Sequence, residues 1–362
     1  MGSGDVTVCS DSPVGVLSGP QHETVVEEIP SAHAGLMANE VKRRWESFTP
    51  GGENNEGIPD PLDEICSYAL TAPGKLFRPV LLLLSAESVG GRVADVLPAA
   101  VGTECGHVAS LIHDDIIDGD AMRRGRPAVY RRYGMDNAIV AGDALLFQIF
   151  LCLAECRAAG VPDGRIVSAM EIVARAGVDL CRGQALEAEI TSRSARDVRA
   201  YLRMVRLKTA ALFSGACQAG AVLGGGPPEW VQALGEYGDA LGIAFQIQDD
   251  LLGYVTDAGT TGKPATSDIK NRRLTLPIIL AYEAGTARDR AVLDAALLGE
   301  LAIDEALDAV GGVLRSTEAI ARSTAMARTY TDRAAAALAL LPASRGRDHL
   351  AGFVERTVSR VR

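Results

Sequence analysis

Two short acidic segments stand inside apolar stretches of the chain and could bind metal ions. Asp114, Asp115 and Asp118 end one such stretch, and Asp249 and Asp250 lie within another farther along the chain. On a helix, the first and third of these acids share a face, and the second lies about 100° away. Carboxylates buried together are costly unless cations neutralise them. Grouped oxygen ligands suit a hard divalent cation, so the segments predict magnesium binding.

A single acidic pair of this kind is often only a solvated helix face or an N-cap. The repetition favours a metal site, because two facing helices could present both sets of carboxylates to one cavity. The second segment is incomplete, because Gly253 stands where a further acid would complete the pattern D-D-x-x-D.

Basic residues near these acids form a second chemical feature. They are Lys75 and Arg78 after Gly74, Arg123 and Arg124 after the first acids, and Lys208 and Lys263 farther along. Arginine suits forked recognition of phosphate, and lysine suits point-charge contact. Any one of these residues alone would be an ordinary surface charge, but their placement beside the acids indicates a small substrate that carries phosphate.

The surrounding sequence predicts the helices that position these residues. Ala, Leu, Arg and Glu recur at three- and four-residue spacings from about residue 60 to the C-terminus, and the alternation typical of strands is nearly absent. We therefore expect an all-α fold, a single large bundle over residues 34–362. Residues 1–33 are rich in Ser, Gly, Asp and Glu without a sustained period, which predicts a disordered N-terminal tail.

Composition excludes several classes of protein. The 362 residues include 46 acidic and 36 basic ones, so no basic surface for a nucleic acid is expected. Seven cysteines without a CxxC pair and the lack of a signal peptide favour a reducing, cytoplasmic location. The uncharged run 209–228 contains Ser, Gln and many glycines, which predicts a buried core helix and no membrane span.

Seven blocks in this order resemble the trans-isoprenyl diphosphate synthases of the polyprenyl synthetase family, over residues 34–362. They read GKLFRP, ECGHVASLIHDDIIDGDAMRRGRP, GDALL, GQALEAE, RLKTAALF, FQIQDDLLG and TGKPATSDIKNRRLT. The resemblance, strongest to bacterial geranylgeranyl diphosphate synthases, implies a helical bundle around a deep central cavity. It also implies the 1'-4 condensation of an allylic diphosphate with isopentenyl diphosphate, by a homodimer with several magnesium ions, three per site.

The resemblance further implies a role for each matching residue. Magnesium would be held by Asp114, Asp115, Asp118, Asp249 and Asp250, and the allylic diphosphate by Arg123, Lys208 and Lys263. Isopentenyl diphosphate would be bound by Gly74, Lys75, Arg78, His107 and Arg124, and the reacting carbons would be lined by Thr209, Gln246, Gln184 and Glu187. Glu187 replaces the aspartate usual in the family, and Arg273 stands where the family has a lysine.

In this family, side chains four and five residues before the first aspartate form a floor that limits the product. Here they are Ser110 and Ala109, with Gly106 one turn deeper, and all three are small. We therefore expect a product longer than C15, namely C20 geranylgeranyl diphosphate. A blocking residue from another helix would change this expectation.

Two alternatives remain open. A class I terpene cyclase on the same fold ionises a diphosphate but needs no second substrate, so its residues for isopentenyl diphosphate would have decayed. Here Lys75, Arg78, His107 and Arg124 are all present, although the incomplete second acidic segment favours the cyclase. A non-catalytic regulatory subunit of a prenyl synthase would have lost a metal-binding aspartate, whereas the first acidic segment is complete.

Overall fold

A computed structural model describes residues 31–46, 60–193, 196–255, 269 and 273–359, which are helical almost throughout. The α-helices are α1 (Ser31–Glu46), α2 (Pro61–Leu70), α3 (Phe77–Ser88), α4 (Val93–Asp118), α5 (Val129–Tyr133), α6 (Met135–Glu155), α7 (Asp163–Arg193), α8 (Val198–Val205), α9 (Ala211–Gly224), α10 (Pro228–Val255), α12 (Leu276–Ala284), α13 (Ala287–Leu298), α14 (Ile303–Ser316), α15 (Ala319–Leu338) and α16 (Arg345–Ser359). A 3-10 turn, η1 (Cys156–Ala159), follows α6, and a π-helical segment, η2 (Arg206–Ala210), joins α8 to α9. The strands β1 (Met122–Arg123) and β2 (Arg126–Pro127) form one small hairpin. The predicted all-α fold is confirmed.

The first helix begins before the end of the predicted tail. Because α1 starts at Ser31, residues 31–33 belong to a helix and were wrongly assigned to the tail. The rest of that segment, residues 1–30, lies outside the described residues.

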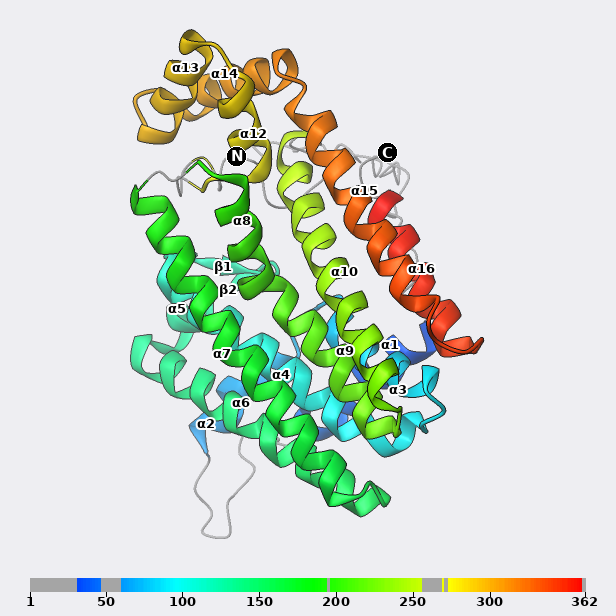
Figure 1. Cartoon of the computed structure of the whole chain (residues 1–362). Coiled ribbons are helices and arrows are strands. Elements are labelled where there is room, and N and C mark those ends of the chain that lie inside the picture. Colours follow the sequence, from blue (N-terminus) through cyan, green and yellow to red (C-terminus); the bar gives the residue numbers. More distant parts are fainter. Residues whose placement is uncertain (1–30, 47–59, 194–195, 256–268, 270–272, 360–362) are drawn as a thin grey trace, which may run out of the picture.

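The longer helices lie alongside one another, and α12 to α14 lie at one end of the bundle (Figure 1). Buried side chains form two hydrophobic clusters. The larger cluster draws on α1 to α7, α9, α10, α15 and α16, and the smaller on α7, α8, η2, α10 and α12 to α15. Tyr330 of α15 packs against both clusters, so the end of the bundle and its body are joined through α15.

The uncharged run 209–228 contains a buried helix, as predicted. α9 packs against α3, α7 and α10, and small residues let these helices approach closely. A Cβ atom on Gly220 would lie 2.2 Å from the carbonyl oxygen of Leu82, so the crossing of α9 over α3 requires glycine. Another segment, Met135–Ala159, is long and apolar enough to cross a membrane by length and composition, and in the fold its helix packs along α4.

The cysteines behave as small hydrophobic residues. Five of the six described cysteines are buried, and burial raises the pKa of the Cys66 and Cys217 thiols to about 12. Thiols of this kind are packing groups and poor nucleophiles. The cytoplasmic location stays a prediction.

The glycine contact between α9 and α3 generates a stability prediction. In Gly220→Ala the new methyl group overlaps the backbone of Leu82, so we expect the free energy of unfolding to fall by about 1–3 kcal/mol. Gly177 is the matched control, because it lies inside α7 with no other atom within 4 Å of its Cβ position. Gly177→Ala should stabilise the protein by up to about 1 kcal/mol. Urea unfolding curves measure both, and equal effects of the two substitutions would contradict the close approach.

Candidate functional site

A tight hairpin after α4 carries two of the predicted cations. β1 pairs antiparallel with β2, and Arg124 and Gly125 form the turn between them with φ of 51° and 75°. Two successive left-handed residues fit a type I′ turn, which matches the twist of the flanking strands. An arginine in this conformation is strained and is held by its surroundings. The hairpin thereby turns Arg123 and Arg124 back toward α4.

Arg124 lies against the segment that leads into α3. A Cβ atom on Gly74 would lie 2.5 Å from Nη1 of Arg124, and this nitrogen donates to the carbonyl oxygen of Ala72 at 3.3 Å. Arg78, in the first turn of α3, and His107 of α4 are electrostatic neighbours of Arg124. The structure therefore brings together four of the five residues predicted to bind isopentenyl diphosphate.

The fifth of these residues, Lys75, is exposed. Its Nζ lies 6.0 Å from the centroid of the Phe77 ring. Lys75 directly follows Gly74 in the turn before α3. Its side chain is exposed at the outer edge of this turn, whereas Arg78 is partly buried.

Several polar atoms of this cluster have no hydrogen-bond partner among the described residues. They are Nε of Arg78, Nδ1 of His107 and Oε2 of Glu104. Buried polar groups are normally paired, because an unpaired one costs about 1–3 kcal/mol. Arg78 and His107 lie deep in the fold yet keep accessible surface, so that surface borders an internal space. The unpaired atoms are themselves shielded from this space, so the accessible parts of the Arg78 and His107 side chains are the groups that a polar ligand there would meet.

Glu104 belongs to this cluster and was missed in the sequence. It is 1% exposed and lies one helical turn before His107 on α4. Burial raises the pKa of Glu104 to about 7, against the opposing influence of Arg124 and Arg78. Burial also lowers the pKa of Arg78 to about 10 and the pKa of His107 well below its usual value. At neutral pH the cluster therefore contains cationic arginines, a neutral histidine and a partly ionised Glu104.

A second group of charges lies toward the C-terminal ends of α4, α7 and α10, where acids pair with bases. Nζ of Lys208 donates to Glu187 at 2.5 Å, Nη2 of Arg273 to Asp118 at 2.5 Å, and Nε of Arg123 to Asp115 at 2.6 Å. Asp114 lies among them, and burial raises the pKa of its carboxyl group while Lys208 acts in the opposite direction. Arg123 and Asp115 thus pair a predicted diphosphate ligand with a predicted metal ligand. Lys208 pairs with the predicted lining residue Glu187, and Arg273 pairs with the predicted metal ligand Asp118.

In the structure, two of the five predicted metal ligands are buried and three keep accessible surface. Asp250 is buried and accepts hydrogen bonds from Tyr201 Oη (2.7 Å), Gln246 Nε2 (2.9 Å) and the backbone N–H of Leu276 (3.2 Å). Asp115 is also buried, against Arg123. Asp114, Asp118 and Asp249, in contrast, keep accessible surface.

The carboxylates with accessible surface are oxygen donors of the kind that magnesium prefers. They are distributed over α4 and α10. Among the residues that the structure describes, no three His, Cys, Asp or Glu side chains form an assembled metal-binding group. The donor set therefore fits magnesium chemically, and one of its members, Asp118, is paired with Arg273 of the protein.

A π-helical segment positions Lys208 and Thr209. Single π turns inside α-helices are rare and often occur at functional sites. A Cβ atom on Gly183 of α7 would lie 2.3 Å from the backbone nitrogen of Lys208, so glycine is required where α7 meets η2. Thr209 Oγ1 donates to Gln246 Oε1 at 2.8 Å, which ties η2 to α10. The predicted lining residues Gln184 and Glu187 are on α7 beside this contact, and the enclosed Oε1 of Gln184 has no hydrogen-bond partner in the described part of the chain.

The three predicted floor residues differ from one another. Ser110 has accessible surface and donates its hydroxyl to the carbonyl oxygen of His107 at 2.7 Å. Ala109 is fully buried. A Cβ atom on Gly106 would lie 2.8 Å from Cδ1 of Ile149, a residue of α6. Lys263, predicted to bind the allylic diphosphate, lies outside the described residues.

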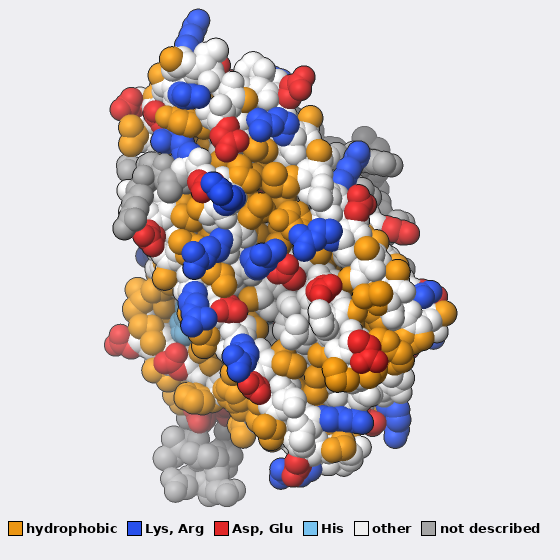
Figure 2. Space-filling model, in the orientation of Figure 1, with side chains coloured by type: hydrophobic (Ala, Val, Ile, Leu, Met, Phe, Trp, Pro, Cys, Tyr) orange, Lys and Arg blue, Asp and Glu red, His pale blue; other side chains and the backbone are white. Residues whose placement is uncertain are grey.

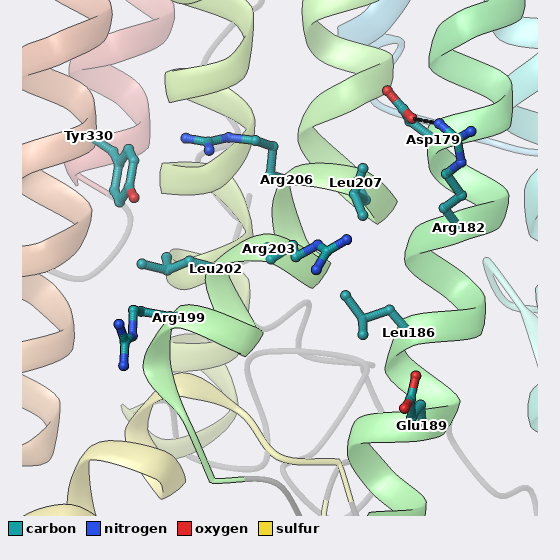
Figure 3. A pocket seen from close by; sticks show the side chains of 10 residues that line it. All are labelled: Asp179, Arg182, Leu186, Glu189, Arg199, Leu202, Arg203, Arg206, Leu207 and Tyr330. Atoms are coloured by element: carbon teal, nitrogen blue, oxygen red, sulfur yellow. Dashed lines mark hydrogen bonds and ion pairs between the residues drawn. The ribbon is translucent and has the colours of Figure 1, made fainter.

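An open groove of about 600 Å³ on the outer face of α7, α8 and α15 is separate from these residues (Figure 3). Its basic lining residues are Arg182, Arg199, Arg203 and Arg206. Lysine and arginine side chains form a row across this face of the molecule (Figure 2). Arg182 and Arg206 pair with Asp179 and Asp239 at 3.0 Å, so much of the charge is already balanced. None of the predicted site residues lines the groove.

Comparison with known proteins identifies a matching family model and similar proteins. Residues 59–310 match the family model described as Polyprenyl synthetase. A geranylfarnesyl diphosphate synthase of Aeropyrum pernix is 37% identical over 287 residues, which are 79% of this chain and 89% of that protein. A geranylgeranyl diphosphate synthase of Methanosarcina mazei is 39% identical over 231 residues, 64% of this chain and 70% of that protein.

The fold is also shared with solved structures. The geranylgeranyl pyrophosphate synthetase of the archaeon Geoglobus acetivorans superimposes with a TM-score of 0.80 and 31% sequence identity. The match covers 92% of this chain and 100% of that one. The same helical bundle is therefore present in both proteins.

The buried acid Glu104 generates a prediction for the ligand-free protein. Because its pKa is raised from 4.5 to about 7 on folding, its stabilising contribution is complete below pH 4.5 and is lost as the pH rises through 7. We compare the free energy of unfolding of the wild type with that of Glu104→Gln. This difference should fall by about 2–3 kcal/mol between pH 5 and pH 8. Urea unfolding at several pH values measures this, with the exposed Glu355→Gln as control. Parallel curves for the wild type and Glu104→Gln would contradict the burial of an ionisable acid.

Proposed function

Because this chain belongs to the polyprenyl synthetase family, we propose that it is a magnesium-dependent trans-prenyltransferase that condenses an allylic diphosphate with isopentenyl diphosphate. One observation carries the proposal: two cationic clusters flank the same helix. Arg78 and Arg124 form one cluster, and Lys208 and Arg273 belong to the other, beside the acids of α4. An enzyme that joins two diphosphate substrates needs two such clusters.

The first cluster is proposed to bind isopentenyl diphosphate. Arg78 and Arg124 supply guanidinium groups, and Gly74 lets the substrate approach the backbone and Arg124. His107, neutral because burial lowers its pKa, can donate one N–H without adding charge. A diphosphate there would contact the accessible parts of the Arg78 and His107 side chains. Lys75, at the outer edge of the turn, would add a further positive charge.

The second cluster is proposed to bind the allylic diphosphate together with metal ions. Magnesium, when bound, neutralises the diphosphate and stabilises it as a leaving group. Asp114, Asp118 and Asp249 are proposed as its direct ligands, because their carboxylates keep accessible surface. Asp115 and Asp250, which were grouped with them in the sequence, support the site through Arg123 and Tyr201. Three ions per site are expected from the family.

The basic residues then change partners. Lys208, Arg123 and Arg273 exchange their protein carboxylates for oxygens of the allylic diphosphate, and Lys263 joins them by resemblance to the family. Loss of the diphosphate leaves an allylic carbocation, which the double bond of isopentenyl diphosphate attacks. A proton then leaves the new chain and is taken up by the released diphosphate.

The reacting carbons are proposed to lie between α7, η2 and α10. The hydroxyl oxygen of Thr209 and the amide oxygen of Gln246 present dipoles to a carbocation, which stabilises positive charge without forming a bond. Gln184 of α7 belongs to the same lining. Before the diphosphate binds, Glu187 holds Lys208 in this wall. The resulting product is proposed to be C20 geranylgeranyl diphosphate, and named relatives include both C20 and C25 synthases.

We also propose that the enzyme is a homodimer formed through α6. Its exposed hydrophobic residues are Met135, Ile139, Val140, Leu146, Phe147, Phe150 and Leu151. They recur at helical spacing on the side away from α4, and hydrophobic side chains gather on this part of the surface in Figure 2. Exposed apolar patches of this kind mark interaction sites. A second copy can cover the patch with the identical patch of its own α6, as two-fold dimers do.

Activity assays test the proposed reaction. With magnesium, isopentenyl diphosphate and dimethylallyl, geranyl or farnesyl diphosphate, the wild type should form linear prenyl diphosphates. Asp114→Asn should lower kcat at least about 100-fold, because the metal-bound diphosphate loses a ligand. Arg124→Gln should raise KM for isopentenyl diphosphate about 10–100-fold and leave KM for the allylic substrate nearly unchanged. The surface variant Asp163→Asn should behave as wild type.

The assay separates the alternatives. A hydrocarbon or alcohol from the allylic substrate alone would identify a terpene cyclase. Lack of turnover with every primer would identify a regulatory subunit, and either result would refute the proposed condensation.

Substitution on the outer face of α6 tests the dimer. Phe147 is 71% exposed, and Phe147→Glu places a charge in the proposed interface, so the protein should become monomeric at micromolar concentration. Leu340, 65% exposed between α15 and α16, is the control, and Leu340→Glu should leave the assembly unchanged. Light scattering after size-exclusion chromatography measures the mass. A wild-type monomer, or a dimer that tolerates Phe147→Glu, would rule out this interface.

A further inference from the structure

Below Asp114, a stripe of accessible surface follows α4, and His107 and Leu111 beside it also keep accessible surface. Ser110, Gly106 and Thr103 have accessible surface at intervals of three or four residues, and the stripe ends where Ala99 is buried. A rise of 1.5 Å per residue makes the stripe about 16 Å long from Asp114 to Thr103. The stripe therefore leads from the proposed metal site into the body of the bundle.

α6 forms the wall beside this stripe. Cδ1 and Cγ1 of Ile149 lie 2.8 Å and 3.5 Å from the position of a Cβ atom on Gly106. One turn farther along α4, a Cβ atom on Gly102 would lie 3.3 Å from Cα of Ile149 and 3.0 Å from Cβ of Cys152. Gly106 thus leaves room on α4, and the end of the Ile149 side chain fills it.

We infer that Ile149 of α6 limits the length of the prenyl product. The inference rests on the proposed condensation, in which the hydrocarbon tail grows away from the diphosphate. A tail that starts at Asp114 and follows the stripe passes Ser110 and then meets Ile149 at the level of Gly106. The bulk that restricts the tail therefore comes from α6, although the residues of α4 at this depth are small.

The backbone around Ile149 cannot close a space left by a smaller side chain. Gly102 already brings α4 within van der Waals contact of the α6 backbone at this point, so the helices cannot approach further. A truncated residue 149 would leave an apolar space next to the stripe. A longer tail would gain hydrophobic contact by entering that space.

Graded substitutions of Ile149 test this role. Ile149→Val removes one methylene group and Ile149→Ala removes the restricting end of the side chain. Product lengths are measured by mass spectrometry after incubation with magnesium, labelled isopentenyl diphosphate and farnesyl diphosphate. We expect the ratio of products longer than C20 to C20 to rise about tenfold in Ile149→Ala and by a smaller factor in Ile149→Val.

Two further variants sharpen the result. Gly106→Ala places a methyl group against Ile149 and should shorten the product, whereas in the Ile149→Ala background it should return the product toward C20. Ile112→Ala is the matched control. Ile112 is as buried as Ile149, at 3% against 8% exposed, but it lies on the side of α4 away from Asp114. It should leave the product lengths unchanged.

The outcomes separate this inference from the proposed function. Wild-type product lengths in both Ile149 variants, with label incorporated at the wild-type rate, would overturn the role of Ile149 and leave the condensation intact. An equal shift in Ile112→Ala would also overturn it, because general loosening would then explain the change. A wild type that incorporates no label with any primer would overturn the condensation itself.

Discussion

The pairing of acids with bases between helices is the interaction on which the candidate site depends. Carboxylates from α4 and α7 lie in the interior, where an unpaired charge is costly. Lys208, Arg123 and Arg273 balance them. The same bases are the proposed ligands of a diphosphate, and accessible acids beside them are the proposed ligands of magnesium. Binding of both together would exchange one set of neutral pairs for another, so the interior need never hold a large net charge.

Two irregular backbone features of the chain serve this pairing. The I′ hairpin directs Arg123 toward Asp115 and Arg124 toward Gly74, and the π turn directs Lys208 toward Glu187. Each feature departs locally from regular α-helical geometry, and the packing around it maintains this conformation. Gly74 and Gly183 remove the side chains that would otherwise separate the charged partners from the neighbouring backbone. The regular helices provide the frame, and the irregular segments determine where the charges meet.

The sequence predicted the helical fold and most of the candidate site because both depend on local patterns. Periodicity indicates which residues share a helix face, and acidic residues in apolar stretches stand out. It does not indicate which neighbouring helix covers that face. Asp250 is buried and hydrogen-bonded to Tyr201 of another helix, whereas the adjacent Asp249 is exposed. In the same way, the contact at Gly106 is made by Ile149 of another helix. Glu104 is a different case, because an acid in an apolar helix one turn before His107 was visible in the sequence and was overlooked.

α6 connects the proposed dimer interface on its outer face with the proposed wall for the product on its inner face. Gly142, Ile149 and Cys152 meet residues of α4, whereas Phe147, Phe150 and Leu151 face outward. Because one rigid helix carries both faces, any shift of α6 that a partner on its outer face causes would also displace its inner face. A different protein bound at that outer surface would therefore alter the shape of the inner wall without touching the substrate. In this architecture, the choice of partner becomes a means of adjusting what the enzyme makes.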